Sequence, residues 1–93
     1  MPAAARIGDA DIGHCSGMVR AEGSDSVFVN GRGWSCQGHF NTPHLLPGDP
    51  CVPHAAPIVM GSIRVFVNGR GAGRVGDATC TAVAEGSENV FCG

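Results

Sequence analysis

The heptapeptide VFVNGRG occurs twice, at residues 27–33 and again at residues 65–71. Valine and phenylalanine favour β-strands, because β-branched and aromatic side chains pack well on a pleated surface. The Asn-Gly dipeptide that follows favours a tight hairpin turn, since both residues tolerate positive φ. The stretch therefore predicts a β-hairpin, and its recurrence predicts a fold built from copies of that hairpin.

The repeat extends beyond the heptapeptide. Residues 23–39 align with residues 61–77 without a gap, and 10 of the 17 positions are identical. In both copies the return strand ends in a second turn, Gly-His in the first copy and Gly-Asp in the second. The first copy has Cys36 and His39 where the second has arginine and aspartate. We interpret Cys36 and His39 as variants of the scaffold.

The two ends of the chain supply a third copy. GSENVFCG at 86–93 matches the opening of the repeat, and AARIGD at 4–9 matches AGRVGD at 72–77. The last strand is therefore expected to pair with the first. The predicted fold class is all-β: a small pseudo-threefold cone of three β-hairpins, the third formed by the N- and C-terminal strands. Residues 1–93 are expected to form a single domain.

Composition argues against several classes of protein. Fifteen glycines and six prolines disfavour long helices. All six basic residues are arginine and the formal net charge is −2, which argues against a nucleic-acid-binding surface. No apolar run approaches the ~20 residues of a membrane helix. The N-terminal MPAAARIGDAD lacks the basic and apolar regions of a signal peptide, so any export is expected to use another route.

The chain has five cysteines, an odd number, so at least one thiol has no intramolecular partner. Without a secretion signal, reduced thiols or metal ligation are expected in preference to disulfides. Cys15 is interpreted as a simple thiol, because it and the adjacent His14 point to opposite faces of an extended chain. Cys92 replaces a strand valine of the repeat and is expected to pack within the strand.

A phenylalanine recurs at one repeat position, as Phe28, Phe66 and Phe91, and a valine precedes it each time. Both residue types are expected to pack in the core. Trp34 has no counterpart in the other copies, and it is expected to cap a sheet edge or to touch a partner. The middle linker, residues 40–60, carries five prolines, whose fixed φ predicts a rigid wrap over the β body.

Metal-type ligands recur at similar distances beyond the turn that ends each repeat. The second turn of the three copies ends at Asp9, His39 and Asp77. His14 and His44 lie five residues after Asp9 and His39, and Cys80 lies three residues after Asp77. The middle linker adds His54. Three histidines and one cysteine make a complete tetrahedral set for Zn²⁺, although these ligands also suit iron. We predict one metal per chain, zinc or alternatively iron, at a closed structural site near the vertex.

Two other residues compete for the metal. Cys51 stands in Cys-x-x-His spacing with His54. His39, at the end of the first copy, is only five residues from His44 in the sequence. Catalysis is not expected, because the chain shows no nucleophile motif and lacks the bulk for a pocket of ~300 Å³. We therefore predict that the protein is not an enzyme, with a small metal-binding enzyme as the alternative.

The ordered motifs MPAAARIGD, GSxxVFVNG, GRVGD and GSENVF resemble those of the PAAR-repeat proteins over essentially the whole chain. The resemblance implies a small β cone with a sharp vertex, near which three histidines and one cysteine hold a metal, usually zinc. Matching positions assign these ligands to His14, His44, His54 and Cys80. The sequence CQGH at residues 36–39, in the copy at residues 23–39, departs from the RxGD that many family members have at this position.

The resemblance also implies a function. Such proteins cap and sharpen a trimeric β-helical spike of a type VI secretion system or a contractile phage tail, and help to pierce the target envelope. One monomer would dock through its base on one spike trimer, VgrG-like or of a phage baseplate, with transient membrane contact and no nucleic acid. The implied location is the tip of a phage tail spike, or secretion by the type VI system without a signal peptide. The alternative is an adaptor that links a spike to a separate effector.

Overall fold

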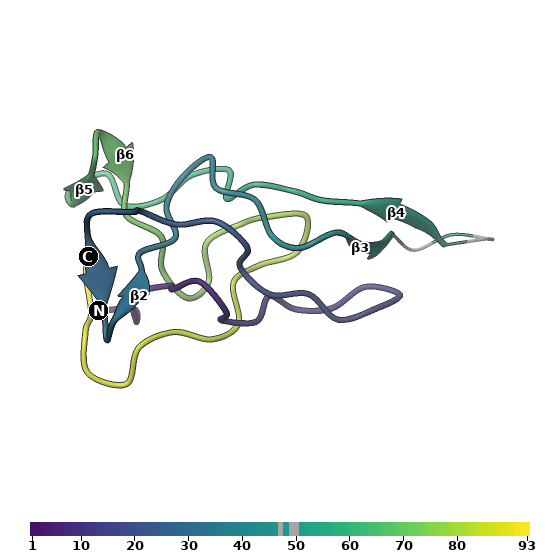
Figure 1. The fold of residues 1–93 in the computed structure, drawn as a ribbon, viewed down its shortest axis with the longest axis horizontal. Helices are drawn as coiled ribbons and strands as arrows, with labels where there is room; N and C mark the ends of the chain where they lie inside the picture. Colours follow the sequence, from purple (N-terminus) through teal and green to yellow (C-terminus); the bar gives the residue numbers. More distant parts are fainter. Residues whose placement is uncertain (47, 49–50) are drawn as a thin grey trace.

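The computed structural model describes residues 1–46, 48 and 51–93, and it shows an elongated body of 39 × 23 × 23 Å. The body is broad at one end and tapers toward the other (Figure 1). Its regular structure consists of three antiparallel two-stranded hairpins, and the described residues include no helix. A helix suited to crossing a membrane is accordingly not found among them. The prediction of a small all-β fold is confirmed.

Two of the hairpins come from the heptapeptide repeat, as predicted. The strands are β1 (Phe28–Val29) paired with β2 (Arg32–Gly33), and β5 (Phe66–Val67) paired with β6 (Arg70–Gly71). The asparagine and the glycine of both turns have φ values between 52° and 79°. These left-handed conformations give the two-residue turn a twist that matches its strands.

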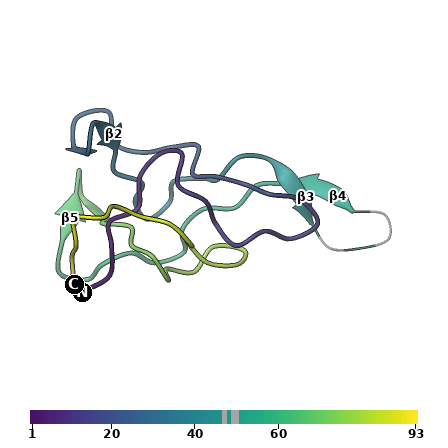
Figure 2. The same cartoon turned by 90° about the horizontal axis from the view of Figure 1, so that it is seen from below.

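The two ends of the chain complete the third copy. Ala3 pairs with Phe91 in an antiparallel bridge, and the Cys92 N–H donates to the Pro2 carbonyl over 3.0 Å. Both termini consequently lie together at the broad end (Figure 2). The predicted pairing of the last strand with the first is therefore confirmed.

The three copies join around a pseudo-threefold axis. Three antiparallel bridges connect equivalent positions of successive copies: Ala4 with Arg74, Trp34 with Arg6, and Cys36 with Ala72. The residues between these positions, Ala5, Ser35 and Gly73, are small and buried. Their backbones lie so close that a Cβ added to Gly73 would collide with the Ser35 carbonyl oxygen. Trp34 is half-buried, and its indole N–H donates to the Gly73 carbonyl over 2.9 Å.

A second set of equivalent positions fills the interior. Backbone N–H groups of the turn glycines Gly8, Gly38 and Gly76 donate to the carbonyls of Arg20, Ile58 and Val83. These last three side chains are almost fully buried. Arg20 thus places a charge where the other copies have an aliphatic side chain. Its guanidinium donates to the equally buried Asp11 carboxylate over 2.6 Å, which compensates the charge.

The middle linker forms a hairpin of its own, in addition to those of the repeat. This arrangement differs from the expected wrap over the body. β3 (His44–Leu46) pairs with β4 (Val52–His54), and this hairpin lies at the narrow end (Figure 1). Pro53 is accommodated because each strand of a two-stranded sheet has one unpaired edge. The prolines at 47 and 50, which were also expected to stiffen the linker, lie outside the described residues.

The recurring phenylalanines are exposed, so the prediction that they pack in the core was wrong. Phe28, Phe66 and Phe91 are 58%, 61% and 47% exposed. The residues that follow them, Val29, Val67 and Cys92, are buried instead. Successive side chains of a strand point to opposite faces. Here the rest of the chain covers the face that carries Val29, Val67 and Cys92, and the phenylalanine face stays exposed. The packing predicted for Cys92 is confirmed.

Candidate metal centre

Three histidines and one cysteine come together at the narrow part of the body. One potential ligand atom from each lies within 4.8 Å of those of all the others, and the residues are His14, His44, His54 and Cys80. These are the four residues that the sequence predicted as ligands, and the structure brings all of them together. The cluster can hold one metal ion.

The β3–β4 hairpin supplies two of the four residues. His44 opens β3 and His54 ends β4, and they are direct cross-strand partners. Their ring centroids lie 4.3 Å apart. Residues opposite one another on antiparallel strands hold their side chains close together, so the formation of this hairpin places both imidazoles at one point.

The other two residues reach the cluster from separate loops. The ring of His14 stacks beside that of His44, with the centroids 5.3 Å apart. Cys80 lies in a tight turn closed by a bridge between Ala78 and Ala82. Its Sγ is 3.3 Å from the Nε2 atom of His44. The cluster therefore joins three segments that are distant in sequence.

Hydrogen bonding leaves the Nε2 atoms available to bind an ion. The Nδ1 of His44 lies 2.8 Å from the Thr42 carbonyl, which assigns the proton to Nδ1 and the lone pair to Nε2. The Nε2 atoms of His14 and His54 are buried and find no hydrogen-bond partner among the described residues. Because a buried polar atom without a partner is destabilising, a bound cation would satisfy both.

The surroundings of the cluster favour neutral imidazole at His54. Desolvation lowers the pKa of His54, and the nearby His44 and His14 lower it further. Metal ions bind the neutral form of imidazole. The cluster therefore already favours the protonation state that coordination requires.

A buried polar network approaches the cluster from the interior of the body. The Nδ2 of Asn41 lies 3.8 Å from the Cys80 Sγ and donates to the Asp11 carboxylate over 3.0 Å. Arg20 donates to the same carboxylate. This network was not predicted. The sequence carried one signal for it, because Asp11 and Asn41 each lie two residues after the turn residue of their own repeat.

His39 lies apart from the cluster and serves the repeat turn. Its Nδ1 accepts a hydrogen bond from the Cys36 backbone N–H over 2.9 Å. The carboxylates of Asp9 and Asp77 accept equivalent bonds in the other two copies. The interpretation of Cys36 and His39 as scaffold variants fits this arrangement, and His39 does not replace His44 in the cluster.

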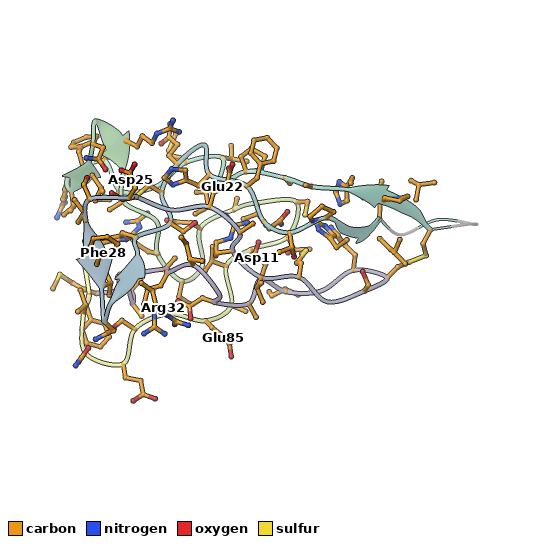
Figure 3. The ribbon with its side chains drawn as sticks, in the orientation of Figure 1. Asp11, Glu22, Asp25, Phe28, Arg32 and Glu85 are labelled. Carbon is orange, nitrogen blue, oxygen red and sulfur yellow. A yellow bond between two sulfur atoms is a disulfide. The ribbon has the colours of Figure 1, made fainter. Side chains whose placement is uncertain are left out.

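Cys51 forms a disulfide with Cys15, and their Cα atoms are 6.4 Å apart. The expectation of reduced thiols was therefore wrong for this pair, and so was the rival assignment of Cys51 as a metal ligand. The bond lies beside the hairpin at the narrow end (Figure 3). Spacing gave no indication of it, because the two cysteines are 36 residues apart. Cys36 and Cys92 are free and buried.

No protein-family model matches this chain, and a search of curated proteins found no relative of it.

Proposed function

We propose that the protein is a PAAR-type spike tip, which caps a trimeric β-helical spike of a contractile injection apparatus and helps it to pierce a target envelope. The apparatus is a type VI secretion system or a contractile phage tail. The observation that carries the proposal is a triad of exposed phenylalanines at the end of the cone opposite the candidate metal centre.

The phenylalanine triad gives each copy of the repeat one exposed apolar side chain. Phe28 lies on β1, Phe66 on β5 and Phe91 on the C-terminal strand, at equivalent repeat positions. Figure 3 shows Phe28 at the broad end. Exposed apolar side chains are stabilised when a partner covers them, and a pseudo-threefold monomer offers the same group to each chain of a trimer. Short strands at this end also have edges that a spike can cover.

The narrow end supports the role of a rigid point. The donor set of three imidazoles and one thiolate fits zinc best, with iron as the alternative. When bound, the ion would cross-link three chain segments and add its binding energy to the stability of the fold. Four protein ligands fill a tetrahedral shell and leave no place for water, which supports a structural site and not an enzyme.

The proposal implies one monomer per spike trimer and a brief contact with the target membrane. The protein would reside at the tip of a phage tail spike, or leave the cell through the type VI system. The formal net charge of −2, with eight acidic and six basic residues, fits a partner that is a protein and not a nucleic acid.

The test mixes the protein with a trimeric spike from which the native tip has been removed. Native mass spectrometry should show one monomer for three spike chains. Replacing Phe28, Phe66 and Phe91 together by Ser should weaken docking at least about 100-fold, since each buried phenylalanine contributes about 1.5–3 kcal/mol. Phe40→Ser is the matched control, because Phe40 is 42% exposed but lies outside the repeat position. Absence of any complex with the wild-type protein would refute the proposal.

A further inference from the structure

The Cys15–Cys51 disulfide joins the two chain segments that carry His14 and His54. Cys15 follows His14 directly, and Cys51 lies three residues before His54, next to the start of β4. The bond therefore spans from the loop of one candidate ligand to the strand of another. None of the four ligand atoms belongs to either cysteine.

The loop that carries His14 has few other connections to the hairpin. The Cys15 N–H donates to the Leu45 carbonyl over 3.1 Å, and the Leu45 N–H donates to the Ser16 Oγ over 2.9 Å. Cys15 and Leu45 are exposed, so water competes for these bonds. The disulfide is the one covalent tie between loop and hairpin within the described part of the chain.

His14 depends on this tie more than the other histidines do. His44 is held by its bond to the Thr42 carbonyl and by its pairing with His54 across the hairpin. The imidazole of His14 has a buried Nε2 atom without a partner among the described residues. Its position therefore follows from the position of its loop.

We propose that the Cys15–Cys51 disulfide is a redox site that sets the metal affinity of the four-residue centre. In the oxidised protein the loop and the hairpin are held together, and the ion is retained. In the reduced protein the loop that carries His14 loses its covalent tie to the hairpin and keeps only hydrogen bonds, so the ion binds more weakly. This inference rests on the metal-binding part of the proposed function and is independent of docking to a spike.

The reducing partner is a low-molecular-weight thiol, such as glutathione. Its thiolate attacks one sulfur of the bond, which forms a mixed disulfide and releases the other cysteine as a thiolate that takes up a proton. A second thiol then attacks the mixed disulfide. The products are two protein thiols and one oxidised small-molecule disulfide, so two electrons and two protons pass to the protein. Cys15 is exposed and Cys51 half-buried, so the bond is accessible to such a reagent.

Thermodynamic linkage makes the coupling reciprocal. If the disulfide strengthens metal binding by some factor, the bound metal must make the disulfide harder to reduce by the same factor. Disulfides persist in oxidising compartments and are reduced in the cytosol. The centre would therefore retain its ion most firmly outside the reducing interior of a cell.

The same measurement would also detect the opposite effect, in which reduction strengthens metal binding. Reduction frees Cys51, which stands in Cys-x-x-His spacing with His54 and offers a thiolate ligand of its own. If the freed thiolates joined the centre, reduction would strengthen metal binding. Comparing the reduced protein with the double variant Cys15→Ser/Cys51→Ser separates the two cases, because the variant has neither the cross-link nor the thiolates.

The experiment measures Zn²⁺ affinity by competition with a chromophoric chelator for three samples of the full chain. These are the oxidised protein, the protein reduced by a phosphine, and the double serine variant. We expect the last two to bind Zn²⁺ about 5- to 150-fold more weakly than the first, the usual range of coupling between two sites. Circular dichroism at each point confirms that the sample is folded.

A second measurement needs no variant. The midpoint of the disulfide is determined in glutathione buffers with free Zn²⁺ either buffered at saturation or removed by a chelator. For each factor of ten by which the disulfide strengthens Zn²⁺ binding, the midpoint reduction potential of the disulfide should be about 30 mV lower with Zn²⁺ present than without it. An unchanged midpoint together with equal affinities overturns this inference and leaves the metal centre standing. Tighter binding after reduction overturns it in favour of thiolate ligation. Failure of Zn²⁺ to bind in any state overturns both this inference and the proposed metal centre.

Discussion

The Nδ1 atom of His39 accepts a hydrogen bond from the backbone N–H of Cys36 over 2.9 Å. In the other two copies of the repeat the acceptor is the carboxylate of Asp9 or Asp77, over 2.8 Å. The histidine therefore replaces an aspartate as the acceptor of the same turn. It can do so only while Nδ1 carries no proton, which makes this turn sensitive to pH in the range where histidine titrates.

The first prediction concerns the pH dependence of stability. Burial lowers the pKa of His39 below its usual 6.5, and the positive charge of Arg70 lowers it further. The unfolded chain therefore binds a proton more readily than the folded one. The stability that neutral His39 contributes to the fold is fully present above about pH 6.5. It is lost as the pH falls through the lower pKa that His39 has in the folded state. Thermal unfolding between pH 7.5 and 5 should show this loss.

The variant His39→Asp is the matched comparison, because it restores the acceptor of the sister copies. Other histidines titrate in the same range, so the quantity to measure is the stability difference between wild type and variant at each pH. That difference should grow in favour of the variant as the pH falls. A difference that does not change with pH would contradict the role assigned to His39.

The second prediction concerns the four clustered residues. Replacing His14 by Ala should abolish stoichiometric metal binding, because three remaining ligands hold the ion poorly. The melting temperature should fall by about 10–20 °C, which corresponds to the loss of a few kcal/mol in a domain of this size. Elemental analysis and calorimetry on the same samples check both outcomes.

The control for the metal prediction is His39→Ala, which removes an imidazole outside the cluster. It should keep one ion per chain and lose only a turn hydrogen bond, about 1 kcal/mol. Metal loss from His39→Ala, or full metal retention by His14→Ala, would show that the wrong residues have been assigned.

The third prediction concerns the buried ion pair of Arg20 and Asp11. Asp11→Asn leaves the buried guanidinium without a counter-charge, and it should lower the free energy of unfolding by about 3–5 kcal/mol. The double variant Arg20→Ile/Asp11→Asn should recover most of this loss, since the sister positions hold Ile58 and Val83. Denaturant unfolding at a fixed metal concentration measures both. If the effects of Asp11→Asn and Arg20→Ile, each measured alone, added up to that of the double variant, the pairing would be excluded.

The fourth prediction concerns the close packing of backbones at the pseudo-threefold axis. A methyl group at Gly73 would collide with the Ser35 carbonyl oxygen and approach the Ile58 side chain to 2.8 Å. Gly73→Ala should therefore destabilise the protein by about 1–3 kcal/mol. Gly17→Ala is the control, because a Cβ there meets nothing within 4 Å; it should be neutral or slightly stabilising. Equal effects of the two changes, measured by denaturant unfolding, would argue against a closely packed axis.

Most of the fold could be predicted because its information is local and repeated. The Asn-Gly turns of residues 27–33 and 65–71 define hairpins without reference to the rest of the chain. The match between the chain ends and the repeat then predicted the terminal pairing now seen between Ala3 and Phe91. Equivalent positions converge in a threefold arrangement, which is why spacing within the repeats indicated His14, His44 and Cys80, whereas His54 was added from the middle linker.

Burial could not be predicted in the same way. Alternation along a strand shows that Phe28 and Val29 point to opposite faces, but not which face the rest of the chain covers. The middle linker posed a similar difficulty. Its prolines indicate extended backbone, and extended backbone is compatible both with a wrap over the body and with the hairpin of β3 and β4.

Contacts between distant residues were available only once the chain had folded. Cys15 and Cys51 are separated by 36 residues, yet the fold places their Cα atoms 6.4 Å apart, within the range in which a disulfide can form. Arg20 looks like a surface residue in the sequence, but the fold buries it with Asp11 and the His39 carbonyl as its partners. Local propensity and repetition specify turns, strands and ligand positions. Pairing across the chain depends on distances that only the assembled cone creates.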